Sequence, residues 1–176
     1  MRTVTYGGAC SLDGFITGPD GAYDWIHFSR DANDIMRDYW NTIDTLVMGR
    51  KTWEIASSQG GGANGMQAYV FSRTLDRINK KGVTLVKDDP GTFVRELKQR
   101  DGKGICVFGG SDFARSLFAA GVVDEVGFNI HPVLLGSGVP AFADPGRRST
   151  LELKECRQID GGCVYVIYRV SKGQSR

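Results

Sequence analysis

Two glycines that follow short apolar runs are the places where this sequence is best suited to chemistry. The first run, residues 43–48, ends at Gly49, and a helical pattern over 51–58 comes next. A strand that passes through a glycine into a helix directs backbone N–H groups and the positive end of the helix dipole at whatever lies above the turn. Arg50 and Lys51 add two positive charges there. The segment therefore predicts a phosphate-binding cradle.

A second junction of the same kind follows the apolar run 104–108. That run leads into Gly109 and Gly110, and a helix is expected over 111–120 with Ser111 as its N-cap. Two such junctions suit a dinucleotide whose pyrophosphate lies between two helix N-termini. The G-x-G-x-x-G fingerprint is absent from the sequence, so a Rossmann domain is not indicated.

Ser72 and Arg73 end a short strand that lies between the two junctions in the sequence. A hydroxyl beside a guanidinium suits a ribose 2′-phosphate, because the guanidinium makes charge-assisted hydrogen bonds to phosphate oxygens. This pair would select NADPH over NADH.

The elements that must position these residues alternate between strand and helix patterns for most of the chain. The last two alternating runs are joined by Asp160-Gly-Gly162, which is a hairpin signal. The pattern predicts an α/β domain with a mostly parallel sheet and an antiparallel edge. The expected strands are 4–12, 43–48, 68–71, 83–87, 104–108, 123–135, 151–159 and 163–170, and the expected helices are 29–40 with Ser29 as N-cap, 51–58, one beginning near Pro90, and 111–120.

The first strand contains three small residues, Gly7, Gly8 and Ala9. Glycine weakens a strand, so either a flat ligand approaches closely here or a neighbouring group needs the space. A long polar loop follows and ends at Asp24-Trp25. A loop of this length that ends in an aromatic residue is a candidate lid.

Composition limits the classes of protein that need consideration. The 176 residues suggest one domain over 1–171 with a polar tail, 172–176. The formal net charge of +2 does not indicate binding to nucleic acid or to an anionic membrane. No apolar stretch approaches the roughly 20 residues of a membrane helix, and the N-terminus lacks the apolar core of a signal peptide. The four cysteines form no C-x-x-C pair, so no metal site is expected and a cytoplasmic location with reduced thiols is favoured.

Four segments, in this order, resemble the dihydrofolate reductase-like superfamily. Within it, the chain is most similar to the branch that contains the reductase domain of the bifunctional riboflavin-pathway deaminase-reductase. The segments are Ser11-Leu-Asp-Gly14, Val47-Met-Gly-Arg-Lys-Thr-Trp53, Val107-Phe-Gly-Gly110, and Val123-Asp-Glu-Val126 with Pro132-Val-Leu-Leu-Gly-Ser-Gly138. The resemblance implies a three-layer α/β fold with a mostly parallel eight-stranded sheet and about four helices.

The same resemblance implies an NADPH-dependent reductase of a pyrimidine-like or pterin-like heterocycle, of the riboflavin-type 5-amino-6-ribosylaminouracil reductase family. It places Ala9 and Ile16 along the nicotinamide and Trp25 in the loop over it, and the Gly109–Gly110 bond is often cis in this family. The cofactor-binding residues are expected to be Ala9, Ile16, Gly49, Arg50, Lys51, Thr52, Ser72, Arg73, Phe108, Gly109, Gly110, Ser111 and Asp112.

One departure concerns the substrate. Dihydrofolate reductases carry a pterin-binding carboxylate on the first helix, and the matching place falls near Asn33 and Asp34 in a polar stretch. This disfavours folate. The chain is therefore either a riboflavin-type reductase, an NADP-binding module without turnover, or a genuine dihydrofolate reductase.

A reductase also needs a route for a proton, since the cofactor supplies only the hydride. Asp13 is the first candidate for a catalytic residue, although it could instead close its own turn. Asp34 and His131 are further candidates and, with Trp25, the expected substrate contacts. Asp34 could equally complement the helix dipole, and a lone histidine before a proline is more often structural.

The resemblance also implies a homodimer that pairs through the late strands. Val164, Val166 and Tyr168 form an apolar face there that would suit an interface. Ordinary core packing accounts for the same pattern.

Overall fold

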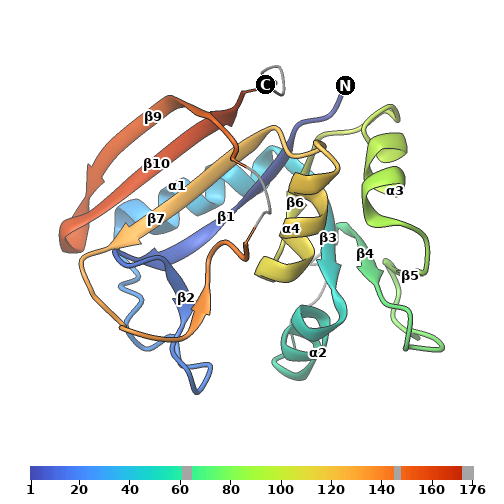
Figure 1. The fold of residues 1–176 in the computed structure, drawn as a ribbon, viewed down its shortest axis with the longest axis horizontal. Coiled ribbons are helices and arrows are strands. Elements are labelled where there is room, and N and C mark those ends of the chain that lie inside the picture. Colours follow the sequence, from blue (N-terminus) through green and yellow to red (C-terminus); the bar gives the residue numbers. More distant parts are fainter. Residues whose placement is uncertain (61–64, 145–147, 172–176) are drawn as a thin grey trace.

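The structure, a computed structural model, describes residues 1–60, 65–144 and 148–171. At its centre lies a twisted sheet of eight strands in the order β5-β4-β3-β6-β1-β7-β10-β9 (Figure 1). The first six strands of that order pair in parallel, whereas β10 pairs antiparallel with both β7 and β9. The predicted α/β fold, with its mostly parallel sheet and antiparallel edge, is confirmed. The predicted tail, 172–176, lies outside the described residues.

The elements follow the predicted order along the chain. The strands are β1 (Val4–Ser11), β2 (Phe15–Thr17), β3 (Ile43–Gly49), β4 (Gln67–Phe71), β5 (Val83–Val86), β6 (Gly104–Val107), β7 (Glu125–His131), β8 (Val139–Pro140), β9 (Leu151–Ile159) and β10 (Cys163–Val170). The helices are α1 (Arg30–Asn41), α2 (Arg50–Ser58), α3 (Pro90–Leu97) and α4 (Ser111–Ala119), with a short 3-10 turn, η1 (Asp160–Gly162), between β9 and β10. None of these helices is long and apolar enough to cross a membrane.

Two details of the predicted strands are wrong. The strand expected over 123–135 is shorter, because β7 ends at His131 and Pro132 has no N–H with which to continue the ladder. In addition, β2 and β8 pair as a second, two-stranded sheet that the sequence did not indicate. Segments of three and two residues are too short to show an alternating pattern.

Helices cover both faces of the sheet, which gives the three-layer arrangement. On one face, α1 and α2 contribute Tyr39, Trp40 and Trp53 to a cluster that includes Leu46 and Met48 of β3. On the other face, helices α3 and α4 pack on the larger cluster, with Val94, Leu97, Ala114 and Leu117 buried. Burying both faces explains why the parallel strands read as nearly continuous apolar runs.

The small residues of β1 have two different explanations. A Cβ built on Gly7 would lie 1.7 Å from the carbonyl oxygen of Gly127, so a side chain there would collide with the neighbouring strand β7. A Cβ built on Gly8 meets no described atom within 4 Å, and Gly8 is exposed although it lies in the middle of a central strand. Gly7 is therefore required by strand packing, whereas Gly8 leaves open space at the surface.

These two glycines make a matched pair for mutation. Gly7→Ala should lower the free energy of unfolding by about 3 kcal/mol or more, because the clash is with backbone that cannot move aside. Gly8→Ala should change it by less than about 1 kcal/mol, since nothing has to move to make room. Chemical denaturation of the two variants and the parent tests this. Equal effects of the two substitutions would contradict the assignment.

Candidate functional site

The two glycine junctions lie side by side at one edge of the sheet. Strands β3 and β6 are parallel neighbours, so their carboxyl ends coincide, and the N–H of Phe108 donates to the carbonyl of Val47 at 2.9 Å. A Cβ built on Gly109 or Gly110 would lie 3.5 or 3.6 Å from Oγ1 of Thr52. The first turn of α2 thus packs against the second junction, and the predicted convergence of the two junctions is found.

The packing is reciprocal, and it involves a residue that the sequence did not single out. A Cβ built on Gly49 would lie 3.3 Å from Cβ of Phe113 in the first turn of α4. That contact is tighter than most, so glycine at this position lets the two helix N-termini approach. Phe113 escaped notice because its role appears only when the two junctions face one another.

Helices α2 and α4 begin differently from the other two helices. Ser29 caps α1 by accepting from the N–H of Ala32, as predicted, and Asp89 caps α3 by accepting from the N–H of Thr92. The N-caps of α2 and α4 are Gly49 and Gly110, and within the described ranges no side chain caps either helix. The free N–H groups of both first turns are thus available to an anion.

The prediction that Ser111 is an N-cap is wrong. Gly110 has the extended conformation of a cap, and its carbonyl accepts from the N–H of Ala114 at 2.9 Å, so Ser111 is the first helical residue. The Gly109–Gly110 peptide bond is cis, as the resemblance implied. Gly109 has φ of +109°, a region that is open to glycine and strained for other residues.

Charged side chains surround the paired junctions. Arg50 is bonded to Glu54 one helical turn later at 2.7 Å, a partly exposed pair that contributes little stability, so its guanidinium can be recruited by a ligand. Lys51 is exposed, and Asp112 in the first turn of α4 is exposed as well. Arg50 and Lys51 together give the edge local positive charge.

Ser72 and Arg73 follow β4, the neighbour of β3, at the same edge of the sheet. The Ser72 hydroxyl accepts from the N–H groups of Thr74 and Leu75 at 3.2 and 3.0 Å, which closes a tight turn. Arg73, the next residue in the chain, is exposed. The turn fixes the backbone from which the Arg73 guanidinium extends.

The residues expected around the nicotinamide come from three separate segments. Ala9 is half-buried on β1, and Ile16 on β2 packs against the larger core cluster. The Phe108 side chain is 40% exposed and its ring lies 6.1 Å from that of Trp40 on α1. Ala9 lies near the carboxyl end of β1 and Phe108 directly follows β6, so these two come from the same edge of the sheet, while Ile16 comes from the second, two-stranded sheet.

His131 lies next to Trp25, the aromatic residue that ends the long loop. Their rings are 5.3 Å apart and nearly perpendicular, and His131 is almost completely buried. Nδ1 of His131 accepts from the N–H of His27 at 3.4 Å and lies 3.3 Å from Sγ of Cys163. Burial, and secondarily His27, lower the pKa of His131. Sequence reasoning did not identify His27, Cys163 or Asn129 as residues of this cluster. For Asn129 a usable signal existed, because it precedes His131 by two residues and so lies on the same face of the strand.

Asp13 is engaged by hydrogen bonds to a second loop. Its carboxylate accepts from the Ser11 hydroxyl at 2.6 Å and from the N–H groups of Leu135 and Gly136 at 3.1 and 2.8 Å. These bonds, that of Ser11 foremost, lower the pKa of Asp13. An ionised carboxylate that holds a loop is a poor proton donor, so the geometry favours the role of closing a turn over a catalytic role.

Asp34 also has a local partner. Its carboxylate is bonded to Arg37 at 2.7 Å, and its side chain is 46% exposed. The structure therefore does not bring Asp34 together with Trp25 and His131 as a buried group.

Comparison with known proteins gives a consistent result. The family model described as "RibD C-terminal domain" matches residues 2–165. The uncharacterized protein YyaP of Bacillus subtilis (strain 168) is 32% identical over 188 residues, which cover 96% of this chain and 95% of YyaP.

Solved structures share the fold at lower identity. A provisionally named riboflavin biosynthesis protein from Shewanella sp. PV-4 superposes with a TM-score of 0.85 at 21% identity, covering 98% of this chain and all of that one. A diaminohydroxyphosphoribosylaminopyrimidine deaminase/5-amino-6-(5-phosphoribosylamino)uracil reductase from Thermotoga maritima gives 0.73 at 17% identity, covering 97% of this chain and 57% of that one. Dihydrofolate reductase from Enterococcus faecalis, complexed with NADP(H) and RAB-propyl, gives 0.69 at 18% identity, covering 97% of each chain.

The bonds of Asp13 predict a pH-dependent stability. A carboxylate whose pKa is lower in the folded than in the unfolded chain stabilises the fold above the unfolded pKa of about 4, and this contribution is lost as the pH falls through the folded pKa. Asp13→Asn should therefore be destabilising at pH 7, with a difference from the parent that shrinks below pH 4. Urea unfolding across this range measures it, with Asp76→Asn as an exposed control. A difference that stays constant with pH would rule out the carboxylate as its source.

Proposed function

The chain belongs to the family of RibD C-terminal domains, and we propose that it is an NADPH-dependent reductase of a pyrimidine-like or pterin-like heterocycle. The observation that carries the proposal is the pair of helix N-termini, α2 and α4, whose glycine caps face one another at a single edge of the sheet. One dinucleotide with two adjacent phosphates matches two such sites. The complex of the Enterococcus faecalis enzyme with NADP(H) supports the same cofactor here.

The residues at this edge fit the parts of that cofactor. The N–H groups of the first turns of α2 and α4 would bind the pyrophosphate, with Thr52 between them and Arg50 and Lys51 adding charge. Arg73, beyond the end of β4, would pair with the 2′-phosphate. Ala9 has a small side chain and is half-buried on β1, which would let the flat nicotinamide lie close to the sheet.

Bound NADPH supplies a hydride, and the work of this chain is to orient and shield the reacting groups. Ala9, Ile16 and Phe108 would hold the nicotinamide, while Trp25 in the long loop would exclude water. Asp13 would keep that loop in place through its bonds to Leu135 and Gly136.

Two observations separate the proposed activity from the alternatives. Asp34 is half-exposed and paired with Arg37, so the first helix offers no buried carboxylate at this position for a pterin ring, which disfavours a dihydrofolate reductase. The likeness to the Thermotoga maritima deaminase/reductase favours a ribosylaminouracil-type substrate. An NADP-binding module without turnover would keep the cradle and the cofactor affinity while reducing none of these compounds.

Turnover is tested by NADPH oxidation with a panel of ribosylaminouracils, dihydropterins and quinones. The proposal predicts oxidation that depends on one of the heterocycles and that falls at least tenfold in Gly110→Ala, because a Cβ would fill the cradle between the two helices. Tight NADPH binding without turnover of any compound would leave the binding module as the function.

Choice of cofactor is tested at Arg73. Arg73→Ala should raise the Kd for NADPH roughly tenfold or more and that for NADH less than twofold, because only NADPH carries the 2′-phosphate. Arg77→Ala, an exposed arginine four residues later, is the matched control and should change neither. Parallel losses for both cofactors would show that Arg73 does not contact the 2′-phosphate.

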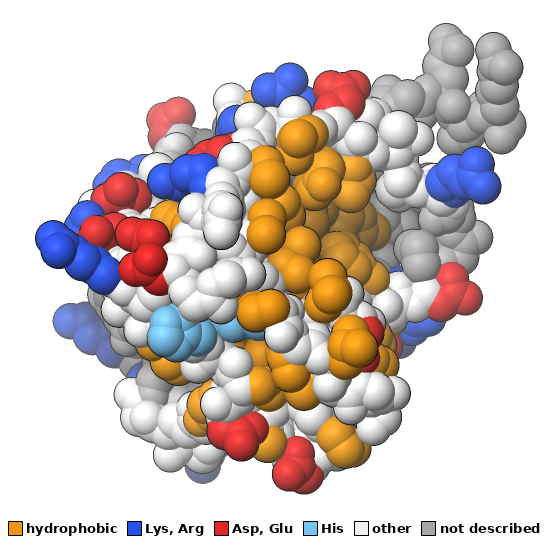
Figure 2. Space-filling model, turned by 90° about the vertical axis from the view of Figure 1, so that its left-hand side faces the viewer, with side chains coloured by type: hydrophobic (Ala, Val, Ile, Leu, Met, Phe, Trp, Pro, Cys, Tyr) orange, Lys and Arg blue, Asp and Glu red, His pale blue; other side chains and the backbone are white. Residues whose placement is uncertain are grey.

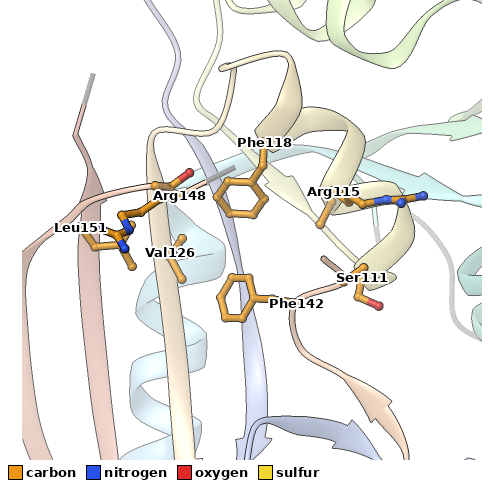
Figure 3. Close-up of a pocket in the computed structure, with 10 residues that line it drawn as sticks. Ser111, Arg115, Phe118, Val126, Phe142, Arg148 and Leu151 are labelled. Carbon is orange, nitrogen blue, oxygen red and sulfur yellow. The ribbon is translucent and has the colours of Figure 1, made fainter. Parts of the chain in front are cut away.

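We also propose a homodimer that pairs through the antiparallel edge. Figure 2 shows hydrophobic side chains gathered over one face of the molecule. Leu153 of β9 is 60% exposed and Phe142 is 48% exposed. Phe142 also lines a mostly apolar pocket of about 260 Å³, where Figure 3 shows the rings of Phe118 and Phe142 on one side and Leu151 on the other. An apolar surface of this kind favours a protein interface.

The homodimer is tested by light scattering of the purified chain. The mass of two chains is expected for the parent and for Met36→Lys, a control at a similarly exposed apolar residue on α1. Leu153→Lys should shift the mass towards one chain, because it buries an unpaired charge in the interface. A parent with the mass of one chain would contradict the proposal.

A further inference from the structure

Two ring nitrogens, one on Trp25 at the end of the long loop and one on His131, are buried in neighbouring side chains. Nε1 of Trp25 and Nε2 of His131 are both inaccessible to solvent, and neither has a hydrogen-bond partner within the described part of the chain. The two rings touch edge to face. Unpaired polar atoms at buried positions are costly, and they require an explanation.

The neighbours of His131 determine which of its nitrogens carries the proton. The backbone N–H of His27 can only donate, and it points at Nδ1. Nδ1 must therefore accept, and the thiol of Cys163, 3.3 Å away, can donate to the same atom. A neutral imidazole with Nδ1 as acceptor carries its hydrogen on Nε2. Burial keeps this ring neutral, since it lowers the pKa of His131.

Two neighbouring donors cannot satisfy each other. The indole N–H has no acceptor capacity, and Nε2 of this tautomer has none either. An acceptor from outside the chain, placed between the two rings, would satisfy both groups. Asn129 adds a buried side-chain oxygen that also has no partner among residues 1–60, 65–144 and 148–171. It precedes His131 by two residues on β7, so both side chains lie on the same face of the sheet.

The positions of Asn129 and His131 suit contact with a substrate of the proposed reductase. His131 ends β7 opposite Ser11 of β1, and Asn129 lies opposite Ala9. Strand β1 separates β7 from β6, whose end forms the second junction. Strands β6 and β7 are therefore about 10 Å apart, which is two steps of strand spacing. A ring held beside Ala9 would lie between the junction at Gly109 and His131.

We infer that Trp25 and neutral His131 form a donor pair that selects a heterocycle bearing a ring oxo group, and that Asn129 receives the adjacent ring N–H. The inference rests on the proposed function, and it makes His131 a hydrogen-bond donor to the substrate oxygen and not its proton source. An oxo group next to a ring N–H presents an acceptor and a donor side by side, which complements two donors and one acceptor. An amino group in the same position would oppose donor to donor.

Two pteridines of the same shape test this pair. Lumazine carries oxo groups at positions 2 and 4, and 2,4-diaminopteridine carries amino groups there. Fluorescence titration at pH 7 with saturating NADP⁺ should give at least roughly tenfold tighter binding of lumazine to the parent protein. Binding of NADP⁺ is measured separately, so failure of the cradle and failure of the donor pair are distinguishable.

Variants assign the preference to the two donors. Trp25→Phe and His131→Phe keep an aromatic ring and remove the N–H. Each should abolish most of the preference for lumazine over 2,4-diaminopteridine, because it weakens the binding of lumazine alone. His131→Gln places an amide N–H near the Nε2 position and should restore part of it. Tyr69→Phe, on β4 with its ring packed against Phe93 of α3, is the control and should bind both pteridines like the parent.

The outcomes are decisive in both directions. A preference for lumazine that is lost in both Phe variants and partly kept in His131→Gln supports the donor pair. A parent that binds both pteridines equally, or prefers the diamino compound, overturns it, as does a preference that survives in both Phe variants. In each of those cases normal NADP⁺ binding would leave the proposed cofactor site intact.

Discussion

The parallel pairing of β3 with β6 is the constraint on which the site depends. It brings two strand ends to the same edge of the sheet, and each strand continues through glycine into a helix. The other two helices have their first N–H groups capped by Ser29 and Asp89, whereas α2 and α4 have glycine caps. The helix N-termini of the described residues are thus of two kinds: those of α1 and α3 are closed by side chains, and those of α2 and α4 are open towards the proposed cofactor.

The sheet also separates two surfaces with different chemistry. The face covered by α1 and the long loop carries the buried polar atoms of Trp25, Asn129 and His131. The opposite face, beside α4, carries the apolar pocket near Phe142. Along β1, Gly7 points to the first surface and Gly8 to the second, because neighbouring residues of a strand face opposite sides of the sheet. The proposed hydride donor and flat acceptor would lie on the first surface, and the proposed second chain on the other.

Sequence patterns predicted what depends on local composition. The run 43–48, the break at Gly49 and the helix after it are visible in the letters, as are the second junction and the hairpin at Asp160. Apart from the convergence of the two junctions, contacts between distant segments were not predictable. The packing of Phe113 on Gly49, the contacts of His131 with His27 and Cys163, and the bonds of Asp13 to Leu135 and Gly136 all join residues that only the fold brings together. The N-cap at Ser111 was mistaken because glycine supplies a cap conformation without a side chain to reveal it.

The most direct measurement of the central claim is an amide NMR titration of the isotope-labelled protein with NADPH. The account predicts that the amide signals of residues 50–52 and 111–113 shift together, with one midpoint and one cofactor per chain, while the capped first turns of α1 and α3 stay unchanged. Shifts confined to one of the two glycine junctions, or different midpoints for the two, would contradict a single dinucleotide held between both helices.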